Sequence, residues 1–155
     1  MLGNDPHQYV RERETPWVSA VLGQCFGSSA WYSCLSDFTV MRKGAVLAVA
    51  SPALASLAIG QKVEPEDLGG WKLHSDETGL VDRVVETDEE ALVEIRRFLS
   101  YMPSHNGETP PAADVPAGSD EAAANIPQIL PDSRKRGYDV RKIINCIVDQ
   151  KSFFE

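Results

Sequence analysis

The stretch that most constrains the fold runs from Gly23 to Asp37, where small residues join a predicted strand to a predicted helix. The apolar run 17–22 predicts a buried strand, and residues 29–35 predict a short helix. A strand that enters a helix through Gly and Ser leaves the first N–H groups of the helix without intrahelical acceptors. Such groups can bind the oxygen of an enolate or of a tetrahedral intermediate. Taken alone, the pattern is more typical of a helix that packs closely on a strand.

The pattern from Trp17 to Met102 alternates short strands and helices. We expect strands at 38–41, 46–50 and 80–85, helices at 51–59 and after Thr87, a helical turn at 65–68, and an N-terminal helix beginning near Asn4. Thr87 and Glu90 form a capping-box pattern, and the helix that follows has one apolar stripe that reaches Met102. This succession predicts an α/β layered domain.

The segment from Gly44 to Gly60 carries no charged residue, so a membrane-spanning helix is an alternative. The segment falls short of the roughly 20 apolar residues that cross a bilayer. Ala and Ser dominate it, and Pro52 lies at its middle. A buried strand followed by a helix with Pro52 in its first turn explains it better, so we expect no membrane span.

Composition narrows the function classes. The 155 residues carry a net charge of −8, and the largest basic cluster is Arg134–Arg136, which argues against nucleic acid as a partner. The three cysteines are an odd number without disulfide-framework spacing, which suits a reducing cytoplasm. The three histidines and three cysteines form no zinc pattern, so no metal is expected. The N-terminus lacks the features of a signal peptide, which also predicts a cytoplasmic protein.

The character of the chain changes after residue 102. Residues 103–133 are rich in Pro, Ala, Gly and Ser without periodicity, which predicts a linker or arm. Residues 134–155 contain an amphipathic helix whose apolar positions are Val140, Ile143, Ile144, Ile147 and Val148. We therefore expect three parts, at 1–102, 103–133 and 134–155. The apolar face of the last helix needs a cover, either from this chain or from another.

Several motifs give the chain a family resemblance. They are Gly23-x-Cys25-x-Gly27, Asp37-Phe38, the run 63–70, His74, the runs 78–82 and 88–92, and the ending at 138–141 and 148–155. In order and spacing these motifs resemble the carboxyltransferase (beta-type) subunit of biotin-dependent acyl-CoA carboxylases and the related decarboxylases. The resemblance covers nearly the whole chain but only the middle of that longer subunit. The run 79–85 before a helix also looks like crotonases, which share the fold.

The resemblance implies a partial crotonase/ClpP-like spiral ββα core, followed by the Pro-rich arm and the amphipathic helix. Residues 1–102 would belong to the N-terminal carboxyltransferase domain, and 134–155 would open a truncated second domain. The implied activity is a transferase reaction, the movement of a carboxyl group between biotin on a carrier protein and an acyl-CoA. The implied partners are biotin carboxyl carrier and biotin carboxylase subunits, with a second copy or a complementary carboxyltransferase subunit.

The resemblance also implies site residues. The turn that holds the thioester enolate aligns with Gly27, Ser28 and Ser29, and the acyl pocket with Ala30, Trp31 and Tyr32. No general base is assigned, because in the family biotin itself is thought to take the proton. Family members usually have a Gly pair within this turn, so the two serines depart from the pattern. A Ser still donates its backbone N–H, but its Cβ narrows the pocket.

Two other functions remain open: a non-catalytic relic or assembly subunit that pairs with a complete carboxyltransferase, and a crotonase-like acyl-CoA hydrolase or isomerase. The second needs an acidic base, which the sequence near the turn does not offer. A nucleophilic Ser28 or Ser29 would need an oriented His and a carboxylate. His74 is the only internal candidate, and we expect it to be a structural hydrogen-bonding residue instead. Cys25 is expected to be an inert buried thiol.

Overall fold

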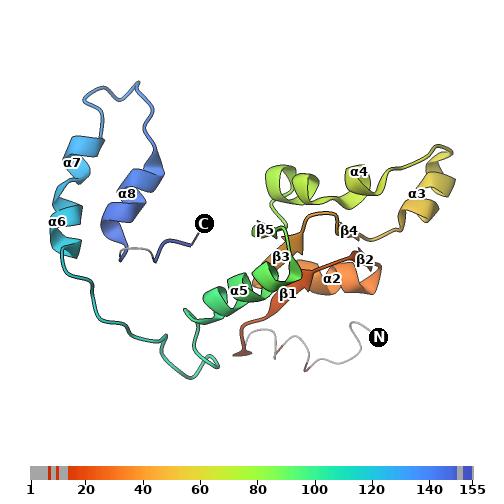
Figure 1. Cartoon of the computed structure of the whole chain (residues 1–155), viewed down its shortest axis with the longest axis horizontal. Helices are drawn as coiled ribbons and strands as arrows, with labels where there is room; N and C mark the ends of the chain where they lie inside the picture. Colours follow the sequence, from red (N-terminus) through yellow and green to blue (C-terminus); the bar gives the residue numbers. More distant parts are fainter. Residues whose placement is uncertain (1–6, 8–9, 11–13, 150–151, 155) are drawn as a thin grey trace. The chain divides into compact units, whose positions relative to one another are not determined.

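The computed structural model describes residues 7, 10, 14–149 and 152–154 (Figure 1). The chain divides into two compact units, Met1–Pro111 and Ala112–Glu155, and each is described by itself. The helix expected to begin near Asn4 has its start outside the described residues. Within the part that the structure describes, no helix combines the length and the apolar character that crossing a membrane requires.

The first unit contains two successive ββα units. In the first, strands β1 (Val18–Val21) and β2 (Gln24–Phe26) lead into helix α2 (Ser28–Cys34); in the second, strands β3 (Phe38–Arg42) and β4 (Val46–Ala48) lead into helix α3 (Pro52–Ile59). β1 pairs with β3 and β2 pairs with β4, and strand β5 (Arg83–Val85) extends the larger sheet to the order β1-β3-β5. Every described pairing is parallel, as the predicted α/β domain requires.

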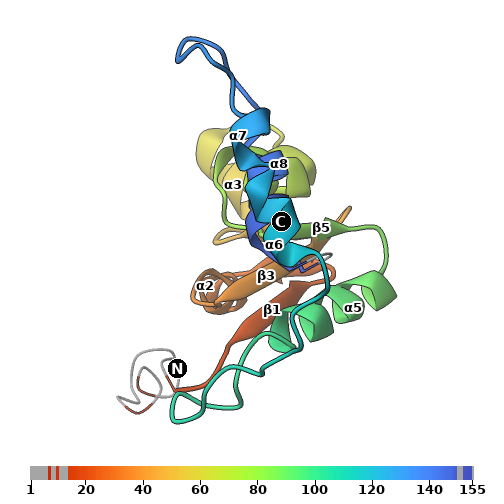
Figure 2. The ribbon, with the colours of Figure 1, turned by 90° about the vertical axis from the view of Figure 1, so that its left-hand side faces the viewer.

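Three further helical segments complete this unit. They are α4 (Pro65–Gly69), the π-helical turn η1 (Leu73–Glu77) and α5 (Asp88–Leu99). Helices α2 and α5 flank strands β1 and β3 from opposite sides (Figure 2). The predicted start of α5 is confirmed, because the Thr87 hydroxyl accepts the N–H of Glu90 at 3.2 Å. The Glu90 carboxylate accepts the N–H of Glu86, one residue before the cap, so the capping box is shifted by one position.

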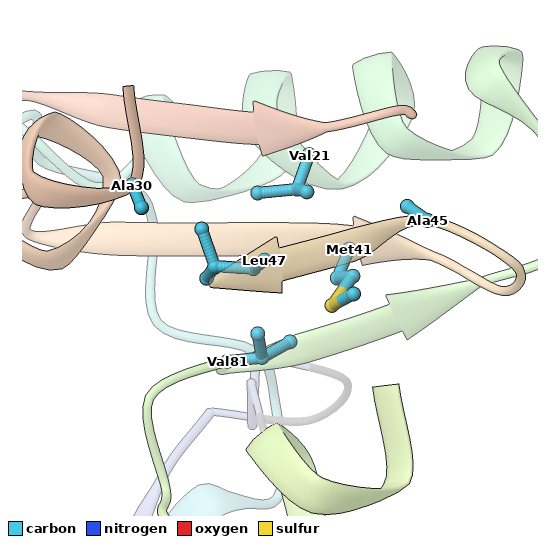
Figure 3. Packing of buried hydrophobic residues seen from close by; sticks show 6 residues of the cluster. All are labelled: Val21, Ala30, Met41, Ala45, Leu47 and Val81. Carbon is cyan, nitrogen blue, oxygen red and sulfur yellow. The ribbon is translucent and has the colours of Figure 1, made fainter. Parts of the chain in front are cut away.

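The core of the first unit lies where the two sheets and α2 meet. It consists of Val21, Ala30, Met41, Ala45, Leu47 and Val81 (Figure 3). On the side of α5, Phe38 stacks on Phe98 with ring centroids 4.5 Å apart. The charge-free segment divides as predicted into β4 and α3, with Pro52 in the first turn and the Ser51 side chain accepting the N–H of Leu54. This division excludes one continuous helix over 46–59.

Three details differ from the sequence-based expectations. Strand β2 was not expected, because its three residues lie within the small-residue stretch and are a strand only through their pairing with β4. The strand predicted at 80–85 begins at Arg83, since the N–H of Val81 donates to the carbonyl of His74 at 3.2 Å instead of to a strand. The apolar stripe of α5 is only partly covered, with Leu92 47% and Leu99 39% exposed.

The second unit is a small group of helices. It contains α6 (Ser119–Ala124), α7 (Ile126–Ile129) and α8 (Val140–Ile147), and α8 contacts both of the others (Figure 1). Two of these helices fall within 103–133, where the sequence predicted a linker without regular structure. The run Glu121–Ala124 has high helix propensity, and Pro127 lies in the first turn of α7, where proline is tolerated. None of the described residues of this unit is buried.

Candidate active site

The predicted site begins at Gly27, where β2 turns into α2. Gly27 has φ 66° and ψ −129°, a backbone conformation that favours glycine because it lacks a Cβ. Its N–H donates to the carbonyl oxygen of Val49 at 3.0 Å, and its own carbonyl accepts the N–H of Ala30 at 3.1 Å. Gly27 is therefore held on both sides. The prediction that Gly27 donates to a ligand oxygen needs correction, since its N–H already has an acceptor just beyond β4.

The two serines that follow differ from Gly27. Ser28 and Ser29 are the first two residues of α2, and both are exposed. Among the contacts of the described residues, their backbone N–H groups have no acceptor. The first N–H groups of a helix lie beyond the reach of its own hydrogen-bond ladder. Two of the three predicted donors are thus adjacent, exposed and available to an oxygen that carries negative charge.

The three residues predicted to contact the acyl group have different environments. Ala30 is 2% exposed and points into the core (Figure 3), so its side chain is not available to a ligand. Trp31 is 53% exposed on the surface of α2. Tyr32 is half-buried, and its ring lies 5.8 Å from that of Trp17. Trp31 is therefore the most accessible of the three side chains.

His74 and Cys25, the candidates for acid–base and thiol chemistry, have structural environments. His74 is buried, with Nε2 2.7 Å from the carbonyl oxygen of Leu47 and Nδ1 3.1 Å from the hydroxyl of Thr78, which confirms its predicted structural role. Cys25 is half-buried against the core, with its Sγ 3.8 Å from the hydroxyl of Ser33. Burial, together with the neighbouring Cys25, raises the pKa of the Cys34 thiol, and a raised pKa opposes reactivity at neutral pH.

Comparison with known proteins identifies the family. Residues 7–155 match the carboxyl transferase domain. The chain belongs to this family. It is 32% identical over 140 residues to the carboxyltransferase subunit of propionyl-CoA carboxylase from Haloferax mediterranei, an alignment that covers 90% of this chain and 27% of the relative. It is 31% identical to the mitochondrial propionyl-CoA carboxylase beta chain of Sus scrofa, covering 90% of this chain and 26% of that protein.

Solved structures of the family have the same fold. A transcarboxylase 12S structure with methylmalonyl-CoA and methylmalonic acid bound has a TM-score of 0.78 and 29% identity, and the match covers 88% of this chain and 26% of that one. A second 12S structure, with hydrolysed methylmalonyl-CoA bound, has a TM-score of 0.73 at 30% identity and covers 88% and 27% of the two chains. The chain therefore spans about a quarter of the length of the relatives that it matches.

Several of the residues that carry the family resemblance hold the backbone together. The Asp37 carboxylate accepts the N–H of Trp17 at 2.8 Å and joins the start of β1 to that of β3. The Asp82 carboxylate accepts the N–H of Thr39 at 2.8 Å and fixes the entry to β5. A Cβ on Gly69 would lie 2.2 Å from the carbonyl oxygen of Leu47, so only glycine lets α4 approach β4 this closely. These motif residues shape the carboxyltransferase domain without contacting the predicted donors.

A pocket of about 590 Å³ lies beside the N-terminal ends of strands β1 and β3. Its walls include Pro16, Asp37, Phe98, Met102 and His105, and none of the six predicted site residues lines it. The described residues contain no group of three or more His, Cys, Asp or Glu side chains placed to hold a metal ion. The candidate site in the described part of the chain is therefore the exposed turn at Ser28 and Ser29.

Proposed function

We propose that this chain is part of an acyl-CoA carboxyltransferase, with the N–H groups of Ser28 and Ser29 stabilising the enolate oxygen of the thioester. The observation that carries the proposal is the pair of exposed donors behind Gly27 in a chain of the carboxyl transferase family. Relatives named for propionyl-CoA and methylmalonyl-CoA favour a short acyl-CoA as the substrate. Biotin, on a carrier protein, would give or take the carboxyl group.

The work of these residues is electrostatic. When a proton leaves the carbon next to the thioester, negative charge develops on the thioester oxygen, and two fixed N–H groups lower the free energy of that state. Gly27 holds the donors in place, because its N–H and its carbonyl are both bonded to the backbone. Backbone donors need no reorganisation during the reaction, which is why they suit this role. Trp31 would contact the acyl group from the surface of α2.

Proline scanning in the assembled carboxylase tests the proposal. Ser28→Pro removes the N–H, and the first position of a helix tolerates proline, so α2 should remain intact. We expect kcat to fall by a factor of about one hundred or more, as for the loss of one oxyanion donor. Ser28→Ala keeps the N–H and should leave kcat within a few-fold. Ser119→Pro makes the same change at the start of α6 and is the control.

Equal losses in Ser28→Ala and Ser28→Pro would assign the role to the side chain and contradict the proposal. Unchanged turnover in Ser28→Pro would show that the N–H of Ser28 has no part in the reaction. It would favour the alternative in which this chain is an assembly subunit. The isolated chain is expected to show no turnover with biotin and an acyl-CoA, because it matches only about a quarter of the length of its relatives.

We further propose that the chain assembles with a second copy or a complementary carboxyltransferase subunit, and with biotin carboxylase and carrier subunits. Ile147 and Val140 of α8 are 68% and 55% exposed, which leaves an apolar surface to be covered. A related 12S structure is described as a hexamer and multienzyme core. Ile147→Asp should abolish association in sedimentation, whereas Val115→Asp, at a residue 72% exposed outside the helices, should not. Association of equal strength in both variants would contradict the assignment to α8.

A further inference from the structure

We infer that His74 is a positioning residue for the turn at Gly27, acting through strand β4. The imidazole holds the carbonyl of Leu47 in the middle of β4, and β4 leads to the Val49 carbonyl that fixes Gly27. The inference rests on the proposed function only in that this turn presents the donors of Ser28 and Ser29. The link from His74 to Gly27 consists of two hydrogen bonds, one at the Leu47 carbonyl and one at the Val49 carbonyl.

The first step is the bond between His74 and Leu47. β4 pairs with β2 on one edge only, and the N–H of Val46 points toward β2, where it donates to Gly23 at 3.0 Å. The polar groups of the next residue, Leu47, therefore face the other edge. Leu47 is 1% exposed, so its carbonyl has no access to bulk water. The Nε2 of His74, 2.7 Å away, supplies the hydrogen bond that a buried carbonyl needs.

The second step is the rigid mounting of the imidazole. A carbonyl oxygen can only accept, so Nε2 carries the proton in this contact. The other nitrogen, Nδ1, lies 3.1 Å from the Thr78 hydroxyl, which fixes the plane of the ring. The backbone of His74 is fixed as well, because its carbonyl accepts the N–H of Val81 at 3.2 Å. The turn η1 thus presents a buried ring with both nitrogens engaged, and π-helical turns such as η1 are frequent at functional sites.

The third step runs along β4 to the candidate site. Leu47 lies opposite Cys25 in the parallel register, and two residues later the Val49 carbonyl accepts the N–H of Gly27 at 3.0 Å. If the Leu47 carbonyl lost its partner, β4 would shift or open to find another, and the Val49 carbonyl would move with it. His74 therefore determines how firmly Gly27 is held, and with it the direction of the first N–H groups of α2.

Hydrogen exchange of the Gly27 amide in the full chain tests this inference. The matched reference is the amide of Lys43, which donates to the Val85 carbonyl at 2.9 Å at the end of the other sheet. His74→Met fills the buried site with an apolar side chain that has no hydrogen-bond donor, and it should accelerate Gly27 exchange by about tenfold or more while Lys43 stays within about twofold. His74→Gln restores an N–H donor and should return Gly27 to within about threefold of the unaltered chain.

Equal acceleration of both amides would indicate general destabilisation and would overturn the inference, as would unchanged exchange at Gly27 or failure of Gln to restore it. Thr78→Val covers the case in which His74→Met does not fold. This substitution removes the hydroxyl partner of Nδ1, together with its contacts to the His74 carbonyl and the Leu80 N–H, and leaves the bond from Nε2 to Leu47 in place. We expect about two- to fivefold faster exchange at Gly27 with Lys43 unchanged. No change at Gly27 in that variant would also overturn the inference. These rates do not depend on turnover, so a failure here is distinguishable from a failure of the Ser28→Pro experiment.

Discussion

The two units of this chain differ in whether they bury an interior of their own. In the first unit Val40, Met41 and Ala45 are 0% exposed, enclosed by two small parallel sheets and the helices around them. In the second unit no described residue is buried, and Ile147 is 68% exposed on α8. Burying an aliphatic side chain of this size stabilises a fold by about 1.5–3 kcal/mol. The second unit is compact but buries too little apolar surface to be stable by itself. The exposed apolar face of α8 is the part that most needs to be covered by a partner.

The largest effect should come from a cavity in the first unit. Leu47 is 1% exposed within the core, so Leu47→Ala should lower the free energy of unfolding by about 2–5 kcal/mol. The corresponding truncation in the second unit, Ile147→Ala, should change it by no more than about 0.5 kcal/mol, because that side chain is mostly in water already. Chemical denaturation of the full chain measures both. Similar losses would show that the second unit has an interior after all.

A smaller effect is expected at the turn of the first unit. Gly27→Ala places a Cβ on a residue with φ 66° and should cost about 1–3 kcal/mol of unfolding free energy, although nothing lies within 4 Å of the added atom. Gly23→Ala is the matched control, since Gly23 has equal space without the positive φ, and should cost less than about 0.5 kcal/mol. Thermal or denaturant unfolding distinguishes the two. Equal costs would mean that the turn is not held in the strained conformation.

The smallest effect concerns the start of α8 in the second unit. The Asp139 carboxylate accepts hydrogen bonds from the side chain and the backbone N–H of Arg141, which lower its pKa. Because the pKa is lower in the folded chain, the cap is fully present above the unfolded value of about 3.9 and is lost as the pH falls through the folded value. The amide shift of Arg141 should therefore change only below about pH 4.

Asp139→Asn is the control for this titration, because an amide can cap the helix without ionising. In that variant the shift of the Arg141 amide should stay flat over the same acidic range. A transition that persisted in Asp139→Asn would assign the pH dependence to another group. A flat profile in the unaltered chain would show that the cap does not form in solution.

The sequence predicted the elements whose signals are local. Pro52 divides the charge-free segment into a strand and a helix, because proline fits the first turn of a helix and not its middle. Thr87 starts α5 through its own hydroxyl, and His74 was expected to be a hydrogen-bonding residue. The family resemblance, which rests on motifs along the chain, was confirmed by the carboxyl transferase domain match. Each of these inferences depends on residues close together in the sequence or on their order.

The tertiary structure decided which groups remain available for chemistry. In the sequence Gly27, Ser28 and Ser29 are equal candidates. In the structure the carbonyl of Val49, which follows β4, accepts the N–H of Gly27 and leaves those of Ser28 and Ser29 without an acceptor among the described residues. The sequence likewise could not show that Ala30 points into the core while Trp31, its neighbour, stays exposed. The order of residues determines where a turn and a helix form. The partner of each N–H and side chain depends on which strand lies alongside, and that is determined only when the chain packs.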